Sequence, residues 1–250
     1  MTKFSTFAIL SDIHGNIDAL DAVLADMESL GVGGLVCLGD IVGYGAEPGA
    51  CVRAIRERCI VSVLGNHEAM FLFCADDPER DLGRIIGKPL ALARQQLTAD
   101  EATWLETLPL IADLEACELV HSSLHEPQEF HYIFTHDEAS AHFAVQKRPV
   151  SFHGHSHLPC VWELGERHRV QCFKAPEEPA VFEPGLRYAV NVGSVGQPRD
   201  SDPRASYAIY DLHERSILIR RVPYDIGKAQ DRIRKARLAA SSSRRLSAGR

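Results

Sequence analysis

The chain has 250 residues, of which 45% are apolar and 24% charged, with ordinary amounts of glycine and proline. A chain of this length and composition can bury a core without disulfides, which excludes a disordered or disulfide-framed protein. No segment approaches the roughly 18 consecutive apolar residues that a membrane helix needs. The apolar run that ends at Leu10 leads into a polar turn without a cleavage site, so we expect a soluble protein whose first segment is a strand rather than a signal peptide.

Charge is unevenly distributed along the chain. Residues 226–250 hold eight basic residues against one acid, whereas residues 1–225 hold 19 basic and 33 acidic residues, a formal charge of −14. We expect one domain at 1–225 and a basic C-terminal helix with a flexible tail at 226–250, which docks on the acidic body or meets an anionic partner. The acidic body disfavours nucleic acid. Seven scattered cysteines without a C-x-x-C pair predict reduced thiols and a cytoplasmic location.

The first quarter of the chain alternates between two kinds of apolar spacing. We expect a strand at 4–10, a helix at 17–30, a strand at 35–38, a helix at 48–58 and a strand at 60–64. This order predicts a parallel sheet with right-handed crossovers.

The rest of the chain changes texture at Pro109. Residues 75–108 are predicted to be helical, with Thr98 and Glu101 at the spacing of a capping box. Beyond them one further helix is expected near 137–146. Short apolar runs predict strands at 110–114, 118–121, 149–153, 160–163, 168–173, 187–192, 206–211 and 217–222. We expect these strands to form a second sheet that packs face to face on the first.

Polar residues with the chemistry of metal ligands follow the predicted strands. They are Asp12, His14, Asp40, Asn66, His67, His121, His155 and His157. The carboxyl ends of strands form the ligand crevice of open α/β sheets, so these side chains are expected to converge. Two carboxylates and several imidazoles would repel one another unless cations organised them, and mixed oxygen and nitrogen ligands suit Mn, Fe, Zn, Ni or Co. In D-I-H and H-S-H the paired side chains would point to one side if the backbone were extended.

Five blocks occur in a fixed order: D-x-H at 12–14, G-D at 39–40, G-N-H-E at 65–68, the strand-terminal His121 and G-H-S-H at 154–157. This series resembles the calcineurin-like metallophosphoesterases. The segment N-V-G-S-V-G-Q-P-R-D at 191–200 resembles their small bacterial and archaeal phosphodiesterase branch. The resemblance implies an α/β fold, a four-layer α/β/β/α sandwich of two mixed sheets, with two divalent transition-metal ions at its edge, Mn or Fe being the first expectation.

The resemblance also implies roles for individual residues. One metal would be held by Asp12, His14, Asp40 and His157, and the other by Asp40, Asn66, His121 and His155. Asp40 would bridge them. A metal-activated hydroxide would attack phosphorus in line, while His67 would protonate the leaving oxygen and, with Asn66, contact the substrate.

Two positions depart from the phosphoprotein phosphatase branch of that family. Gly43 and Tyr44 stand where that branch has an Asp that orients the catalytic His and an Arg that holds phosphate. This difference argues against a protein substrate and leaves the orientation of His67 unassigned. A guanidinium group matches phosphate oxygens, so Arg199 is a candidate for the lost contact and Tyr44 for contact with the leaving group, with loop stabilisation as the alternative for both.

The expected function is that of a binuclear metal-dependent phosphoesterase, above all a phosphodiesterase acting on a small-molecule or nucleotide phosphate ester. The alternatives are a dinucleoside polyphosphate hydrolase, a serine/threonine phosphoprotein phosphatase, or a non-catalytic metal-binding scaffold of the same fold. No membrane partner is expected, and the oligomeric state is open. His153, next to the last block, is expected beside the ligands rather than among them.

Overall fold

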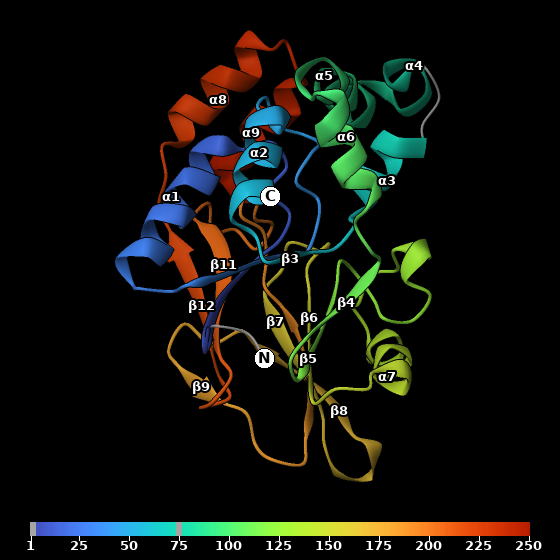
Figure 1. Cartoon of the computed structure of the whole chain (residues 1–250), viewed down its shortest axis with the longest axis vertical. Coiled ribbons are helices and arrows are strands. Elements are labelled where there is room, and N and C mark those ends of the chain that lie inside the picture. The colour runs from blue at the N-terminus through green and yellow to red at the C-terminus, as the bar shows by residue number, and fades with distance from the viewer. Residues whose placement is uncertain (1–3, 74–76) are drawn as a thin grey trace.

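The computed structural model describes residues 4–73 and 77–250 (Figure 1). Its first elements are β1 (Thr6–Leu10), α1 (Ile17–Ser29), β2 (Gly34–Cys37), α2 (Pro48–Arg58) and β3 (Val61–Ser62). These three strands pair in parallel, which confirms the predicted parallel arrangement. The third strand is shorter than predicted because residues 63 and 64 already belong to the loop that leads to the candidate site.

The first sheet is mixed and has the order β3-β2-β1-β11-β12-β9. Its second half comes from the other end of the chain, with β9 (Ala180–Val181), β11 (Ala205–Asp211) and β12 (Ser216–Val222) pairing in antiparallel fashion. We expected the strands at 206–211 and 217–222 in the second sheet, and this was wrong, because β11 pairs with β1 and extends the first sheet. Strand β1 lies at the junction, and its Ala8 is the register partner of Ile209 on β11. The two-residue strand β9 was not predicted, since two residues carry no alternation.

The second sheet has the order β4-β5-β6-β10-β7-β8 and is also mixed. Its strands are β4 (Ile111–Leu114), β5 (Cys117–Val120), β6 (Val150–His153), β7 (Cys160–Leu164), β8 (Val170–Lys174) and β10 (Arg187–Asn191). Strands β5, β6 and β10 run parallel, and the others are antiparallel to their neighbours.

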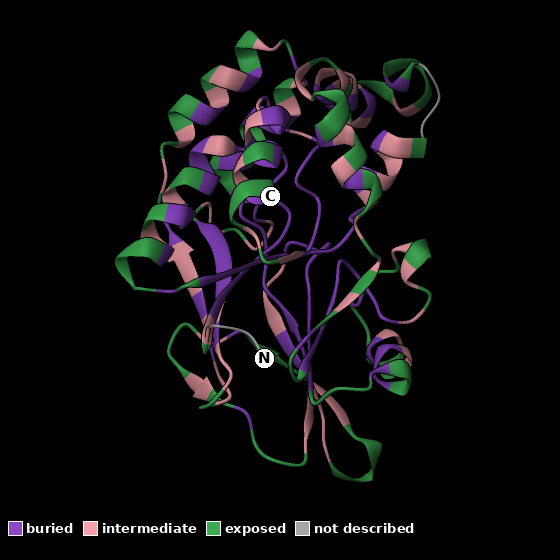
Figure 2. Cartoon of the chain, viewed as in Figure 1, coloured by how far each residue is buried: buried purple, intermediate pink, exposed green. Residues whose placement is uncertain are grey.

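Alternation along β1 divides the core into two layers. Phe7 and Ile9 are fully buried between the two sheets, with Phe152 of the second sheet in the same cluster. Ala8 and Leu10 face the opposite way, into a cluster with the apolar residues of α1 and α2. On the outer face of the second sheet, α7 (His136–Val145) packs around Phe143. Figure 2 shows the buried residues concentrated in the central strands, so the predicted four-layer α/β/β/α sandwich is confirmed.

The helical segment predicted at 75–108, whose residues 75 and 76 lie outside the described residues, consists of several short helices together with the helix that precedes it. They are α3 (Asn66–Phe73), α4 (Pro78–Leu82), a π-helical turn (Gly83–Gly87), α5 (Lys88–Gln96) and α6 (Ala99–Glu106). The predicted capping box is present at the start of α6: Glu101 N–H donates to Thr98 Oγ1 (3.2 Å), and Thr98 N–H donates to Glu101 Oε2 (2.7 Å).

The C-terminal segment forms two helices, α8 (Ile226–Lys235) and α9 (Ala240–Ala248), where we expected one helix and a flexible tail. Helix α9 is ordered because Leu246 is buried in a small apolar cluster with Ile233 of α8. Arg232 on α8 forms ion pairs with Asp18 and Glu47, so basic residues of this segment do contact acidic ones on the body.

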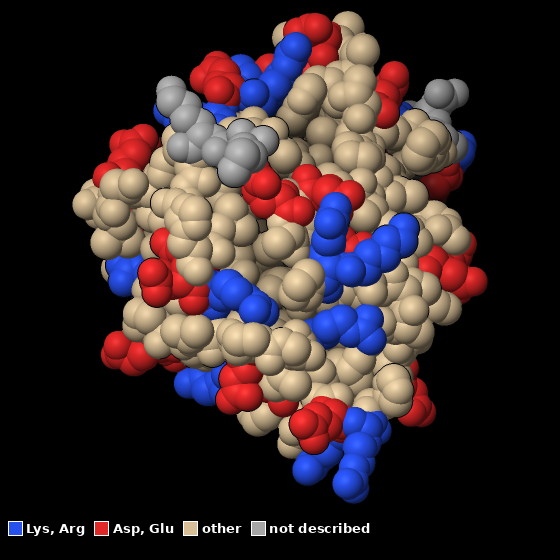
Figure 3. Space-filling view, turned by 60° about the horizontal axis from the view of Figure 1, so that its bottom comes forward, with Lys and Arg blue, Asp and Glu red and all other residues tan. Residues whose placement is uncertain are grey.

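Charge is mixed on one face of the molecule. On the face drawn in Figure 3, Lys and Arg side chains lie interspersed with Asp and Glu side chains. This pattern differs from the continuous basic stripe that is typical of nucleic-acid-binding proteins. Within the described part of the chain, every helix is too short or too polar to cross a membrane.

Candidate active site

The side chains predicted to bind metal come together at one edge of the two sheets. Asp12 and His14 follow β1, Asp40 follows β2, Asn66 and His67 begin α3, His121 follows β5, and His155 and His157 follow β6. All of these residues except Asn66, which is partly exposed, are buried. Buried ionisable groups at this density require an organising partner, because desolvation disfavours each charge.

One group of ligand atoms surrounds Asp12. The Nε2 atom of His157 lies 3.2 Å from Asp12 Oδ1, and the Nε2 atom of His14 lies 3.7 Å from the same oxygen. The two imidazole nitrogens lie 3.1 Å from each other. Atoms from three separate positions in the sequence therefore face a single small volume.

A second group adjoins the first. His121 Nε2 lies 3.4 Å from Asp40 Oδ2, 3.0 Å from Asn66 Oδ1 and 3.2 Å from His155 Nδ1. Asp40 Oδ2 is also 3.6 Å from His14 Nε2, which belongs to the first group. Asp40 thus lies between the two groups, as a bridging ligand would.

The histidine tautomers indicate that these groups fit metal ions. Backbone carbonyls accept hydrogen bonds from the Nδ1 atoms of three of them: His14 to Val42 (3.0 Å), His121 to Leu38 (2.7 Å) and His157 to Gln197 (2.5 Å). Such bonds place the proton on Nδ1 and leave the Nε2 lone pair free for a metal. Asp12 Oδ1, facing these lone pairs, has no hydrogen-bond partner among the described residues. Lone pairs and carboxylates that point at one another repel unless a cation lies between them, so the donor set fits divalent ions.

The protonation tendencies agree with this conclusion. Burial lowers the pKa of His14 well below its usual value and that of His155 to about 3. Burial alone would raise the pKa of Asp12 and Asp40, but the neighbouring imidazoles, His157 and His121 respectively, hold both below their usual range. Although burial lowers the pKa of His121, Asp40 raises it to about 10. A divalent cation would meet the same demand for positive charge.

The backbone conformation at the candidate ligands differs from the one that we expected. We expected extended backbone in D-I-H and H-S-H, and this was wrong: φ is 54° at Asp12, 49° at His14, 65° at His155 and 61° at His157. Asp40 has φ of 53°. All five lie in the left-handed region, which costs a non-glycine residue roughly 1–2 kcal/mol. The side chains are therefore aimed by tight turns that the surrounding structure must stabilise.

Glu68 stabilises the turn that contains Asp40. Its fully buried carboxylate accepts hydrogen bonds from the backbone N–H groups of Asp40 (2.7 Å), Ile41 (2.8 Å), Val42 (3.0 Å) and Gly65 (3.0 Å). The sequence showed Glu68 in the G-N-H-E block but gave it no role. Burial, followed by the charge of Asp40, raises its pKa to about 7.

The segment at 191–200 braces the turns that follow β1 and β6. Asn191 Nδ2 donates to the carbonyl of Gly154 (2.6 Å), and Ser194 Oγ donates to the carbonyl of Asp12 (2.8 Å). Sequence reasoning had matched this segment to a family branch without giving Asn191 or Ser194 a role. His153 is buried beside Asn191, 3.3 Å from its amide nitrogen, and lies outside the two groups of candidate ligands.

His67 is positioned by ring packing. Its imidazole lies 4.7 Å, between ring centroids, from both His14 and Tyr44. Its backbone N–H donates to Asp40 Oδ1 (2.8 Å), and its Nε2 lies 4.0 Å from Asp40 Oδ2, close enough for His67 to share a ligand set with His14. Its buried Nδ1 has no partner among the described residues. Gly43 packs against this ring, and a Cβ at Gly43 would overlap it.

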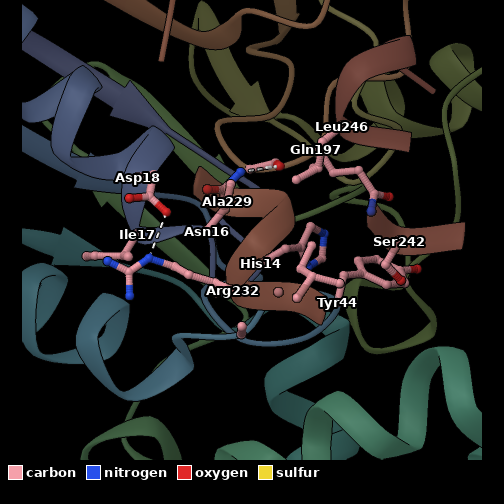
Figure 4. A pocket seen from close by; sticks show the side chains of 15 residues that line it. His14, Asn16, Ile17, Asp18, Tyr44, Gln197, Ala229, Arg232, Ser242 and Leu246 are labelled. Atoms are coloured by element: carbon pink, nitrogen blue, oxygen red, sulfur yellow. Dashed lines mark hydrogen bonds and ion pairs between the residues drawn. The ribbon is translucent and has the colours of Figure 1, made fainter. Parts of the chain in front are cut away.

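Arg199 and Tyr44 lie together on the His14 side of the site. The guanidinium carbon of Arg199 is 5.8 Å from the centroid of the Tyr44 ring, and Arg199 Nη2 donates to Gln197 Oε1 (3.2 Å). Figure 4 shows His14 and Tyr44 lining the same hollow as Leu246, which comes from α9. The structure therefore brings a cation and a phenol to the rim of the candidate metal centre.

Comparison with known proteins agrees with this architecture. A family model described as the calcineurin-like phosphoesterase superfamily domain matches residues 6–215. An uncharacterized protein of Methanocaldococcus jannaschii is 36% identical over 252 residues, which cover 98% of this chain and 99% of that protein.

Two solved structures are similar over nearly their whole length. A metallophosphoesterase from Sphaerobacter thermophilus has a TM-score of 0.88 and 35% identity, with 99% of this chain and 100% of that chain covered. A hypothetical protein from Pyrococcus horikoshii has a TM-score of 0.76 and 19% identity, with 98% of each chain covered, and supports the fold alone.

Proposed function

This chain belongs to the calcineurin-like phosphoesterase superfamily and is a hydrolase of phosphate esters, and from that premise we propose that it is a binuclear metal-dependent phosphodiesterase acting on a small-molecule or nucleotide ester. The observation that carries the proposal is the pair of adjoining ligand groups that meet at Asp40.

The two metal sites would share Asp40. Asp12, His14 and His157 complete one, and Asn66, His121 and His155 complete the other. Two divalent ions, for which Mn or Fe is our first expectation, would supply positive charge for the phosphate oxygens and lower the pKa of a water molecule. The protein positions the side chains that would bind the metals. The Nδ1–H bonds to backbone carbonyls fix the imidazole rings in the orientation that metal binding requires.

We assign the proton transfer to His67. Its Nε2 faces Asp40, beside the candidate ligands, and is the atom that would hold the proton for the leaving oxygen. Burial lowers the pKa of His67, which keeps the ring neutral at neutral pH in the free protein. The negative charge of a bound ester raises the pKa of a neighbouring imidazole and so favours the protonated form that a general acid needs.

Arg199 and Tyr44 are assigned to the substrate. A guanidinium fork matches two phosphate oxygens, and Arg199 is held at the rim by Tyr44 and Gln197. The His67 ring packs against Gly43, so a side chain with a carboxylate at position 43 would overlap the ring. His67 is oriented instead by its ring contacts with His14 and Tyr44. A site without that carboxylate differs from the phosphoprotein phosphatase pattern and favours a small ester over a phosphoprotein.

The test is hydrolysis of bis(p-nitrophenyl) phosphate beside p-nitrophenyl phosphate, with metal-stripped protein reloaded with Mn, Fe, Zn, Ni, Co or Mg. We expect metal-dependent cleavage that favours the diester. His67→Ala is expected to lower kcat by about 10²–10⁴-fold with the bound metal retained, since that is the usual contribution of a general acid. Asp40→Asn is expected to lose both metal and activity.

His213→Ala is the matched control, because His213 is an exposed histidine away from the site. Its activity should equal that of the wild type. Full activity in His67→Ala would contradict the assigned proton transfer. Two bound ions without turnover of either ester would contradict the phosphodiesterase and favour a metal-binding scaffold.

A further inference from the structure

Large aromatic side chains are left exposed around the candidate metal centre. Phe73 is 82% exposed, Phe134 54% and Tyr132 40%. Among the described residues only one other aromatic side chain, Phe173 on β8, is comparably exposed. Exposed apolar surface that gathers in one place is typical of a binding site rather than of chance. Phe134 and Tyr132 line one hollow and are candidates for contact with a ligand, whereas Phe73 lines a separate one.

The rings of the loop between β5 and α7 contact the candidate ligands directly. Phe130 lies edge to face with His121, with centroids 6.0 Å apart. Tyr132 stacks on His155 at 4.1 Å, and Phe134 stacks in turn on Tyr132 at 4.9 Å. An aromatic wall thus begins at one candidate metal site and continues outward to the surface.

This wall borders a hollow with room for an organic group. The hollow has a volume of about 560 Å³ and is lined by Phe130, Tyr132 and Phe134 together with Ser123, His131 and Asp137. Ligand pockets commonly fall between about 300 and 1,000 Å³ and combine apolar walls with a few polar groups. The three aromatic rings can stack on a flat heteroaromatic ring. The hydroxyl of Ser123, the imidazole of His131 and the carboxylate of Asp137 can form hydrogen bonds with its polar edge.

The wall is fixed before any ligand arrives. Phe134 and Thr135 donate their backbone N–H groups to Glu138 Oε2, each at 2.8 Å, and Glu138 N–H donates to Thr135 Oγ1 at 3.3 Å. This capping box ties the end of the loop to the first turn of α7. A preorganised aromatic surface binds with a smaller loss of conformational entropy than a mobile one.

We propose that the hollow lined by Phe130, Tyr132 and Phe134 is the subsite for a nucleobase, so that the substrate is a nucleotide phosphodiester. The inference rests on the proposed phosphodiesterase function. The phosphate would lie at the ligand groups around Asp40, with Arg199 on one side and the aromatic wall on the other. Bases stack on aromatic side chains, and the polar residues of the hollow face the edge of such a ring.

A second hollow provides an internal comparison. It has a volume of about 360 Å³, lies against Asn66 and is lined by apolar residues that include Met70, Phe73 and Leu82, with Phe130 as the wall shared by both hollows. Its lining suits an acyl or alkyl group rather than a base with a polar edge. Phe134 and Phe73 are thus two exposed phenylalanines that belong to different hollows.

The experiment compares two chromogenic diesters that share the p-nitrophenolate leaving group: the p-nitrophenyl ester of thymidine 5′-monophosphate and methyl p-nitrophenyl phosphate. Phe134→Ala should lower kcat/KM for the thymidine ester about tenfold, in line with the loss of one base-stacking contact, and leave the methyl ester within twofold. Phe134→Tyr should restore the thymidine ester. Phe73→Ala is the matched control and should leave both esters within twofold.

Calorimetry on the metal-loaded protein gives a second measurement, with thymidine 5′-monophosphate compared with 2-deoxyribose 5-phosphate. We expect tighter binding of the nucleotide and loss of that preference in Phe134→Ala. Equal kcat/KM for the two esters together with equal binding would overturn the base subsite and leave the phosphodiesterase intact. A selective loss in Phe73→Ala would place the base in the other hollow and overturn this assignment. Preferential, Phe134-dependent binding without hydrolysis would support the subsite while the proposed function fails.

Discussion

Replacing Glu68 by glutamine tests how the candidate metal site is held. The Glu68 carboxylate accepts four backbone hydrogen bonds, two at each oxygen. In Glu68→Gln one oxygen becomes an NH₂ group, so two buried N–H groups lose their acceptor and face a donor. Each such group costs about 1–3 kcal/mol, which gives about 2–6 kcal/mol of lost folding free energy. Burial, followed by the charge of Asp40, raises the pKa of Glu68, so removing this buried negative charge moves the expected value toward the lower end of that range.

The measurement is urea unfolding of the metal-free protein, followed by circular dichroism, with diester hydrolysis by the metal-loaded protein. Glu118→Gln is the matched control, because Glu118 is a buried carboxylate that accepts backbone N–H groups of Lys147 and Arg148. In Glu118→Gln the amide oxygen can still accept both bonds, because both end on Oε2, so little stability and no activity should be lost. Glu68→Gln should lose both stability and activity, since the turn at Asp40 would relax. Wild-type activity in Glu68→Gln, or a loss of stability below about 0.5 kcal/mol, would refute the reasoning.

Two further predictions concern single side chains. Gly43→Ala should lower kcat by at least tenfold with little change in bound metal, because a Cβ at this position overlaps the His67 ring and the backbone φ is 95°. Kinetics together with metal analysis checks this prediction. An unchanged kcat would show that activity does not depend on the position of the His67 ring. Burial lowers the pKa of His142 well below 6.5. As the pH falls below about 6.5, His142 therefore binds a proton in the unfolded chain but stays neutral in the folded protein, which lowers the free energy of unfolding. Unfolding free energies from pH 7 to 5 should therefore fall less steeply in His142→Gln, by up to about 1.4 kcal/mol per pH unit, and parallel slopes would contradict a neutral buried His142.

The sequence allowed prediction of those features that depend on local pattern. Apolar spacing predicted all strands except β9, but it assigned β11 and β12 to the wrong sheet, because sheet membership depends on pairing between distant segments. The position of Asp12 or Asp40 after a strand was enough to predict convergence, because strand ends meet at one edge. The positive φ angles of the turns at the candidate ligands could not be predicted from the local pattern. Asp12 and His155 have positive φ in turns that distant residues brace, Ser194 at Asp12 and Asn191 beside His155, and no local preference of these residues indicates it.

The remaining misses have the same origin in long-range contacts. Ser/Arg-rich composition at the C-terminus predicted a flexible tail, but burial of Leu246 against α8 orders α9. Glu68 is one acidic residue among many until the fold surrounds it with four N–H groups. Nothing in the local sequence distinguishes Phe130 and Tyr132 from core aromatic residues, and only the structure places them beside His121 and His155.

The pairing of β1 with β11 has a consequence for how the protein acquires its site. These neighbours in the first sheet are separated by about 200 positions in the sequence, as the register of Ala8 opposite Ile209 shows. Contacts between such distant segments slow folding, because the loop entropy is lost before the contact is gained. During synthesis the turn at Asp12 therefore lacks its brace from Ser194 until most of the chain has left the ribosome. Binding of the proposed metal ions is therefore expected late in synthesis, once this brace can form.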